Sequence, residues 1–304
     1  MRPALLVMAL CSGCVIGGDR YIKPRDLAQS WLVDRARILA IRAEPPEAVA
    51  GEVVTFEALI PNPEADPADD GSTLWLACPP DPNNPGGIGF GCELDFGALD
   101  FESMDVNELT AAGVIGFEPF LSPSYVVPGG LLDGLSTERD RREGVNVTVQ
   151  VTALPSTTLE DPPDDLDFNE IEIGYKRLVV SEATTPNQNP AIFEFVVDRL
   201  TVLPDTLVHV EPEQAYELGV ILEENLVETY EYLTRDGVVE KRREEPYASW
   251  YTTDGEMLEP ITLYPYTEAT WRAPKKSGVS GLWYAVVRDR RGGMTWYVQE
   301  WITD

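Results

Sequence analysis

Short stretches in which hydrophobic and polar residues alternate follow one another along most of the chain. The clearest is 146–154, where the valines at positions 145, 147, 149 and 151 point one way and the polar residues at 146, 148, 150 and 152 point the other way. A period of two is typical of a β-strand that is buried on one face. A second strand is expected at 175–180, so the pattern predicts an antiparallel sheet in this part of the chain.

The alternating pattern restarts after residues 185–190, whose sequence Thr-Pro-Asn-Gln-Asn-Pro breaks regular structure. Asp236-Gly237 lies between two strand-like stretches and is a strong hairpin signal, and Arg291-Gly292-Gly293 is a turn between two aromatic-rich strands. The expected strands of this half lie at 192–202, 207–222, 249–251, 269–271, 282–287 and 294–302. We therefore predict one domain over 35–185 and a second over 186–304.

The two halves echo each other weakly. Each has a tryptophan on a middle strand, Trp75 and Trp250, followed by a strand that ends in proline, Pro128 and Pro274, and then by a terminal hairpin. The first half is longer because 81–144 is expected to be an insertion, with helix-compatible pieces at 106–112 and 137–143. The pattern predicts an all-β chain of two tandem antiparallel β-sandwiches, the first with a long, partly helical insertion.

The second half resembles bacterial immunoglobulin-like repeats over most of 208–304. The resemblance rests on Ser249-Trp250, Gly255, Thr270-Trp271 with Ala273-Pro274, Gly278, Val287-Arg288-Asp289 and Gly292-Gly293. The first half resembles the opening of the same class, through Pro45-Pro46, Gly51-Glu52 and the alternating Val54, Phe56 and Ala58. The resemblance implies immunoglobulin-like domains with spacer, adhesion or binding roles, and it carries no active site.

The first 13 residues have the pattern of a signal peptide. Arg2 precedes a short apolar run, 4–10, which is far shorter than the roughly 20 residues of a membrane-spanning helix. The small residues Ser12 and Gly13 then precede Cys14 and resemble a bacterial lipobox, although Cys11 stands where the lipobox has leucine. Lipidation of Cys14 is the favoured prediction, with 14–34 as the anchor and linker, and ordinary secretion is the alternative.

The lipobox resemblance implies a protein that is anchored to a membrane and does not span it. More than one acyl chain on Cys14 would give stable anchoring. No acidic residue follows Cys14 directly, because Val15 and Ile16 come next, and this favours the outer membrane over retention in the inner membrane.

The net charge argues against two kinds of polyanionic partner. The 52 acidic and 23 basic residues give a formal net charge of -29, which repels nucleic acid and anionic lipid headgroups. Cations or basic surfaces remain as electrostatic partners, and simple solubility is the alternative explanation of the charge.

Cys78 and Cys92 remain beside Cys14 once the signal peptide is removed. A pair of cysteines in an oxidising compartment most simply forms a disulfide, which here would close a short loop rich in proline and glycine. Metal binding by this pair is the weaker alternative, because zinc sites need more ligands.

An acidic stretch suggests a calcium site as a further hypothesis. Asp161, Asp164, Asp165, Asp167 and Glu170 accumulate there without a basic residue, and such oxygen-rich clusters suit calcium. The spacing departs from an EF-hand loop, so only a looser site between sandwich loops is expected. A solvated acidic loop is the favoured interpretation, and the calcium site is the alternative to it.

No catalytic motif stands out. His209, the one histidine of the chain, lies in an alternating run and is expected to be a strand residue. Trp283, Trp296 and Trp301 cluster in the last hairpin. Core packing of one sheet face is the commoner explanation for such a cluster, and contact with a sugar or protein partner is the alternative.

The sequence therefore predicts a non-enzymatic lipoprotein of the cell envelope that binds, adheres or serves as a structural module. Its expected partner is an envelope protein or a polysaccharide. The first alternative is a calcium-dependent adhesive module. The second, which the sequence supports less, is a carbohydrate-active enzyme that uses a pair of carboxylates.

Overall fold

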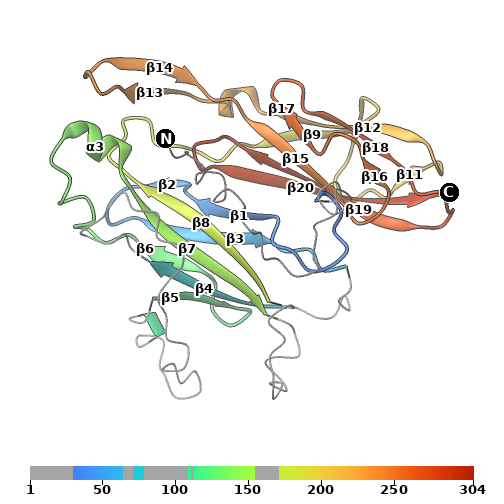
Figure 1. Cartoon of the computed structure of the whole chain (residues 1–304), viewed down its shortest axis with the longest axis horizontal. Coiled ribbons are helices and arrows are strands. Elements are labelled where there is room, and N and C mark those ends of the chain that lie inside the picture. The colour runs from blue at the N-terminus through green and yellow to red at the C-terminus, as the bar shows by residue number, and fades with distance from the viewer. Residues whose placement is uncertain (1–29, 64–70, 79–108, 111–112, 155–170) are drawn as a thin grey trace, which may run out of the picture.

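The computed structural model describes residues 30–63, 71–78, 109–110, 113–154 and 171–304. Over these residues the chain is all-β, with one short α-helix, and forms two β-sandwiches that lie against each other (Figure 1). No helix in the described part of the chain is long and apolar enough to cross a membrane.

The first sandwich packs a sheet of three strands against a sheet of five. The three-stranded sheet has the order β1-β3-β6, and the five-stranded sheet has the order β2-β8-β7-β4-β5. Its elements are β1 (Ala40–Glu44), β2 (Glu47–Ala48), β3 (Val53–Leu59), β4 (Ser72–Cys78), β5 (Val114–Glu118), β6 (Ser124–Val126), α3 (Glu138–Glu143), β7 (Val145–Leu154) and β8 (Glu172–Val180).

The second sandwich packs two five-stranded sheets, β10-β9-β12-β18-β16 and β11-β20-β19-β15-β17. A separate two-stranded hairpin, β13–β14, projects from it towards α3 of the first sandwich (Figure 1). The elements are β9 (Ile192–Val197), β10 (Leu200–Val202), β11 (Val208–Val210), β12 (Ala215–Leu222), the 3₁₀ turn η2 (Glu224–Leu226), β13 (Thr229–Leu233), β14 (Val239–Arg243), β15 (Tyr247–Thr252), β16 (Glu256–Met257), β17 (Ile261–Leu263), β18 (Glu268–Arg272), β19 (Ser280–Arg288) and β20 (Met294–Thr303).

The two sandwiches share one strand order. In each, a short early strand pairs in parallel with the last strand, β2 with β8 and β11 with β20, while the neighbouring strands pair antiparallel. The order β1-β3-β6 corresponds to β9-β12-β18, and β2-β8-β7-β4-β5 corresponds to β11-β20-β19-β15-β17. This is the arrangement of immunoglobulin-like domains, so the chain contains two of them in tandem.

Two tryptophans occupy equivalent places in the two cores. Trp75 on β4 and Trp250 on β15 are fully buried, and each indole N–H donates to a threonine hydroxyl, of Thr73 at 2.8 Å and of Thr262 at 2.9 Å. A buried indole needs such a partner for its polar edge. The weak echo that these tryptophans create in the sequence therefore reflects a shared core position.

The long strand predicted around 146–154 is β7, and its four valines are buried. Its polar side differs from the prediction, because Gln150 and Thr152 are buried too. The predicted helix at 137–143 is α3, where the hydroxyl of Thr137 accepts from the backbone N–H of Asp140 as an N-cap.

Part of the predicted insertion, 81–144, belongs to the sandwich. Residues 114–118 and 124–126 form β5 and β6, which pair with β4 and β3. Strands of five and three residues give only a weak period-two signal, so the sequence pattern does not separate them from the insertion. Residues 79–108 and 111–112 lie outside the described residues.

A separate apolar cluster lies between the two sandwiches. It contains Val33, Leu39 and Ala40 from before and within β1, and Tyr284 and Val286 from β19. The segment before the first sandwich also pairs with the second sandwich, since the N–H of Val33 donates to the carbonyl of Thr252 at 2.8 Å. The irregular segment 181–191 then connects β8 to β9.

Candidate binding site at the junction of the two domains

The turn between β19 and β20 directs an arginine into the junction between the domains. Asp289 holds this turn, because one of its carboxylate oxygens accepts from the backbone N–H of Arg291 at 2.7 Å and of Gly292 at 2.9 Å. Gly292 has a φ of +119°, and a Cβ on Gly293 would lie 2.1 Å from the Asp289 carboxylate. The two glycines are therefore required for this turn.

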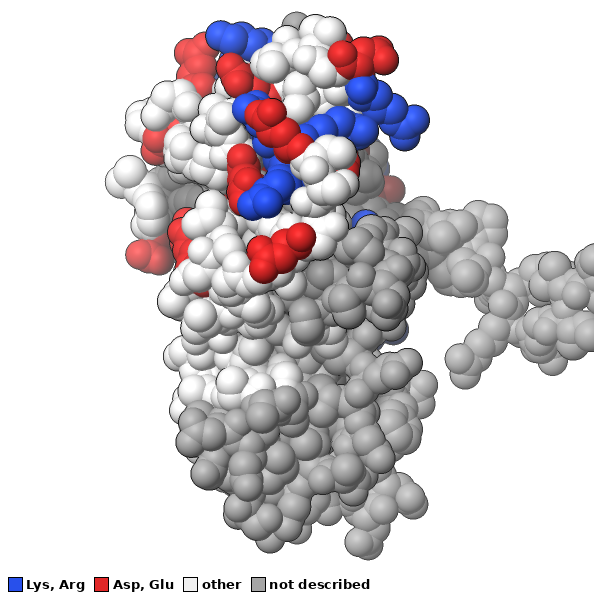
Figure 2. All heavy atoms as spheres, turned by 90° about the vertical axis from the view of Figure 1, so that its left-hand side faces the viewer, with Lys and Arg blue, Asp and Glu red and all other residues white. Residues whose placement is uncertain are grey.

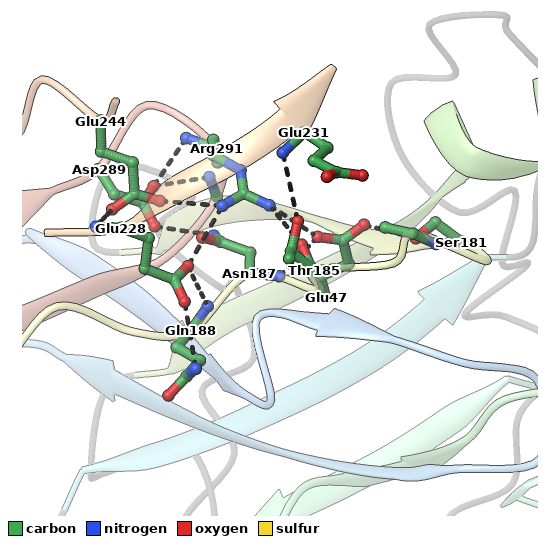
Figure 3. A network of polar contacts seen from close by, with 12 residues as sticks. Glu47, Ser181, Thr185, Asn187, Gln188, Glu228, Glu231, Glu244, Asp289 and Arg291 are labelled. Carbon is green, nitrogen blue, oxygen red and sulfur yellow. Dashed lines mark hydrogen bonds and ion pairs between the residues drawn. The ribbon is translucent and has the colours of Figure 1, made fainter. Parts of the chain in front are cut away.

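The guanidinium of Arg291 contacts three carboxylates (Figure 3). Glu47 on β2 lies 3.3 Å away, Glu228 before β13 lies 3.2 Å away and Glu244 after β14 lies 3.1 Å away. Arg291 also donates to the carbonyl oxygen of Thr185 in the connecting segment at 3.2 Å. One side chain thus joins the first sandwich, the connecting segment and the base of the hairpin.

Further hydrogen bonds fix the connecting segment in the junction. Glu47 accepts from the hydroxyl of Ser181 at 2.5 Å and from the backbone N–H of Asn187 at 2.7 Å. The amide of Asn187 donates to Asp289 at 2.7 Å (Figure 3). Lys176 on β8 donates to the carbonyl of Gly292. The connecting segment is therefore held from both sides.

Acidic groups outnumber basic groups in this buried network. Glu244 and Asp289 are 4% and 1% exposed. The pKa of Glu244 is raised to about 7, chiefly because burial penalises the charged carboxylate and secondarily because Asp289 repels it, while a backbone N–H of Glu228 and Arg291 act in the opposite direction. Burial likewise raises the pKa of Asp289 and lowers the pKa of Lys176 to about 8.

A pocket of about 200 Å³ opens next to this network. One wall is the end of α3 and β8, the second is the connecting segment, and the third is β13. The lining residues are Glu47, Arg142, Glu143, Val179, Ala183, Thr184, Thr185, Tyr230, Glu231, Tyr232, Leu233 and Arg291. Both sandwiches therefore contribute to one concave site.

The surface around the pocket carries basic and acidic side chains side by side (Figure 2). Seven of the 23 lysines and arginines lie on α3 and the β13–β14 hairpin: Arg139, Arg141, Arg142, Arg235, Lys241, Arg242 and Arg243. Several are paired, since Arg139 contacts Glu143 at 2.6 Å and Arg142 contacts Glu138 at 2.7 Å. This end is therefore much closer to charge balance than the rest of the molecule.

Arginine side chains stack on two tyrosines of the pocket wall. Arg242 lies 3.7 Å from the ring centre of Tyr232, and Arg291 lies 4.2 Å from the ring centre of Tyr230. Such cation–π contacts fix the orientation of both rings. The hairpin base and the pocket wall are therefore preorganised.

The predicted aromatic contacts in the last hairpin need correction. Trp283 and Trp301 are fully buried and pack around Trp271, with ring centres 4.8 Å from it, so they form the core of the second sandwich and cannot reach a partner. Trp296 is half-buried and packs on the apolar cluster between the domains, beneath Arg42 at 4.8 Å. Inward and outward positions of such an aromatic-rich hairpin are hard to tell apart by composition.

The other predicted sites have different outcomes. Cys14, Cys92 and the acidic residues Asp161, Asp164, Asp165, Asp167 and Glu170 lie outside the described residues, so the lipid anchor, the disulfide from Cys78 and the calcium site stay predictions. Among the described residues, no group of three or more histidine, cysteine, aspartate or glutamate side chains is placed to hold a metal ion. His209 lies on β11, as predicted, and its ring contacts Asp304 at 2.6 Å.

Sequence reasoning missed the Arg291 network. We interpreted Arg291 only as part of a turn, and nothing links Glu47 to it across 244 positions of sequence. One local signal existed: Glu228 and Glu244 flank the predicted hairpin symmetrically, which places two carboxylates together at its base.

No family model and no curated protein matches the chain. Many solved structures show distant similarity, and three of them illustrate its extent. A nucleoside hydrolase-related protein from Saccharophagus degradans is 11% identical (39% of this chain, 26% of that one, TM-score 0.26). Three N-terminal domains of the outer capsid protein Hoc of bacteriophage RB49 are 11% identical (88% and 59%, TM-score 0.21). The fibronectin(III)-like modules of CbhA from Clostridium thermocellum are 7% identical (87% and 94%, TM-score 0.23).

These similarities are too distant to inform function. The chain spans 26% and 59% of the length of the first two structures. At such identities and TM-scores they carry no argument about ligand, partner or activity. The immunoglobulin-like assignment therefore rests on the strand order described above.

Proposed function

We propose that the chain is a non-enzymatic binding module of the cell envelope that engages its partner at the pocket between the two sandwiches. The pocket itself carries this proposal, because both domains and the connecting segment line it. Ligand sites occur preferentially at such domain interfaces. Immunoglobulin-like sandwiches commonly present binding surfaces at their loops and ends.

The rigidity of the junction supports the same proposal. Arg291 ties the hairpin base to Glu47 of the first sandwich, and the apolar cluster adds a second contact between the two sandwiches. A site whose walls are fixed before binding loses little conformational entropy when the partner arrives. Two sandwiches held this way act as one binding surface.

Co-sedimentation with isolated envelope fractions tests this function. Each protein, the one with the unaltered pocket included, carries Cys14→Ser, which removes the proposed acyl anchor and the need for detergent, and is mixed with outer membranes, inner membranes and cell-wall polysaccharide from the source cells. We expect the protein with the unaltered pocket to bind one fraction and Tyr232→Ala to bind it at least about tenfold more weakly. Tyr266→Ala is the matched control, because Tyr266 is 82% exposed and does not line the pocket. Equal binding by all three proteins would remove the pocket from the function.

We further propose that the chain reaches the envelope as a lipoprotein with its anchor on Cys14, preferably in the outer membrane. Intact-mass spectrometry of the membrane fraction compares the wild type with Cys14→Ser. The anchored protein should carry acyl chains that the variant lacks, and the variant should leave the membrane fraction. An unmodified mature chain in both cases would make this a secreted protein.

A further inference from the structure

The charged residues that line the pocket are largely neutralised by their own neighbours. Arg142 is paired with Glu138, Glu143 with Arg139, and Glu47 with Arg291. The remaining carboxylate, Glu231, accepts from the hydroxyl of Thr184 at 3.3 Å. A charged ligand would have to compete with these pairs.

An anionic ligand meets the larger obstacle. Arg291 already contacts three carboxylates, and it is only 15% exposed. Removing a partly buried arginine from its partners leaves uncompensated charges, which is strongly unfavourable. The net charge of -29 also repels an anion from the whole molecule.

A cationic ligand would bind over the faces of the pocket tyrosines, but arginines of the protein already occupy such positions. Arg242 and Arg291 already stack on Tyr232 and Tyr230, and Arg142 of α3 also lines the pocket. A cation approaching from solvent would meet acidic surface almost everywhere else before it met this charge-balanced end. The pocket therefore favours a neutral ligand.

The groups that remain available suit a ligand rich in hydroxyls. A paired carboxylate keeps free lone pairs and a paired guanidinium keeps free N–H donors, so Glu143, Glu231 and Arg142 can still form hydrogen bonds. The exposed hydroxyls of Thr184 and Thr185 add groups that both donate and accept. Tyr230 and Tyr232 add aromatic surface for C–H groups, which a sugar ring presents between its hydroxyls.

Size restricts the ligand to one ring. The pocket holds about 200 Å³, below the range of roughly 300–1,000 Å³ that is usual for sites enclosing a whole small molecule. We propose that the pocket binds a single uncharged sugar residue of a larger glycan, which rests on the proposed function of the pocket as the binding site. The rest of the glycan would lie on the surface around α3 and the hairpin.

A glycan array tests this inference with the full chain in a detergent that has no sugar headgroup, since a maltoside would compete. The array carries neutral glycans beside glycans with uronate, sialate or sulfate groups. We expect binding to neutral glycans only. The best neutral glycan is then titrated against the wild type, Tyr232→Ala, Thr184→Trp and the control Tyr266→Ala by isothermal titration calorimetry.

Tyr232→Ala should weaken the affinity about tenfold by removing one ring face, and Tyr266→Ala should leave it unchanged. Thr184→Trp should abolish binding by filling the pocket mouth. This variant should keep the fold, because Thr184 is exposed on the connecting segment. Loss of binding in this variant would therefore not result from misfolding.

Three results would overturn the sugar ligand: no neutral glycan binds, only charged glycans bind, or neutral binding survives both pocket variants. If envelope fractions still depend on Tyr232 while no neutral glycan binds, the sugar ligand is wrong and the binding function stands. If envelope binding is indifferent to the pocket variants, the proposed function itself fails.

Discussion

The apolar and the ionic parts of the domain junction join the same two sandwiches by different means. The apolar part buries Val33, Leu39 and Val286 and needs no charge. The ionic part places Arg291 among several acidic side chains, of which Glu244 is the most fully buried of the three that contact it. Apolar burial is insensitive to pH and non-directional, whereas the ionic contacts are directional and depend on protonation.

This difference assigns separate roles to the two parts. Burial of apolar surface holds the domains together, while the fixed geometry of a guanidinium among carboxylates sets their mutual orientation. The pocket borders the ionic part only, since Glu47 and Arg291 line it. Changes in the ionic part should therefore alter the binding site, and changes in the apolar part should alter stability alone.

The largest effect is expected from Arg291→Ala, which leaves Glu47, Glu228 and Glu244 without their shared cation. Removing one partner of a buried charge cluster costs about 3–5 kcal/mol. The loss should be greater at pH 8 than at pH 5, because Glu244, whose pKa is raised to about 7, is protonated at pH 5 and then needs no cation beside it. Chemical denaturation at both pH values measures it. Arg290→Ala is the control, since Arg290 is half exposed, and an equal loss in both variants would refute a special role for Arg291.

Leu39→Ala should have the next largest effect, a loss of about 2–3 kcal/mol from removing a buried leucine side chain. Leu39 is 5% exposed in the apolar cluster. Unlike the loss in Arg291→Ala, this one should be the same at pH 5 and pH 8. A clear pH dependence of the Leu39→Ala loss would contradict the separate roles of the apolar and the ionic part of the junction.

The stability of the wild type should also depend on pH, by less than the losses in the two variants above, and this dependence should come from Glu244. Its pKa in the folded protein is about 7 against an ordinary 4.5. The folded state therefore binds a proton more tightly than the unfolded state, so stability is fully present below about pH 4.5 and is lost as the pH rises towards 7. The melting temperature should fall by a few degrees over this window.

Glu244→Gln should flatten this fall, whereas the exposed neighbour Glu245→Gln should leave it unchanged. Scanning calorimetry from pH 5 to pH 7.5 stays below the pKa of Lys176, which burial lowers to about 8, so this lysine remains mostly charged over the range. If the melting temperature of Glu244→Gln falls with pH as steeply as that of the wild type, another group binds the proton, and Asp289 is the next candidate.

The smallest effect is expected from Arg42→Ala at the border of the two parts. Arg42 stacks on Trp296 at 4.8 Å and pairs with Glu57, and both contacts are partly exposed. Exposed contacts of this kind contribute about 0.5–1 kcal/mol. A loss above 2 kcal/mol by denaturant titration would mean that the apolar cluster depends on this arginine.

Local sequence patterns predicted the strands but not the side-chain contacts between strands and between the two sandwiches. The valines of β7 alternate in sequence, so period-two counting finds the strand without knowledge of its neighbours. The burial of Gln150 and Thr152 has no such local signal. The contact of Arg291 with Glu47 likewise depends on how the two sandwiches meet. The burial of Trp283 and Trp301 depends on their packing against Trp271, which belongs to the facing sheet.

The strand-like pairing of residues 31–33 with β15 has a mechanical consequence. Thr252 donates to the carbonyl of Trp31 at 3.0 Å and accepts from Val33 at 2.8 Å, so the chain is fastened to the second sandwich before it enters the first. Tension applied ahead of Trp31 reaches the second sandwich through these bonds without passing along the connecting segment 181–191. The two sandwiches would therefore bear the applied force together, as one rigid body, and would not be extended one after the other.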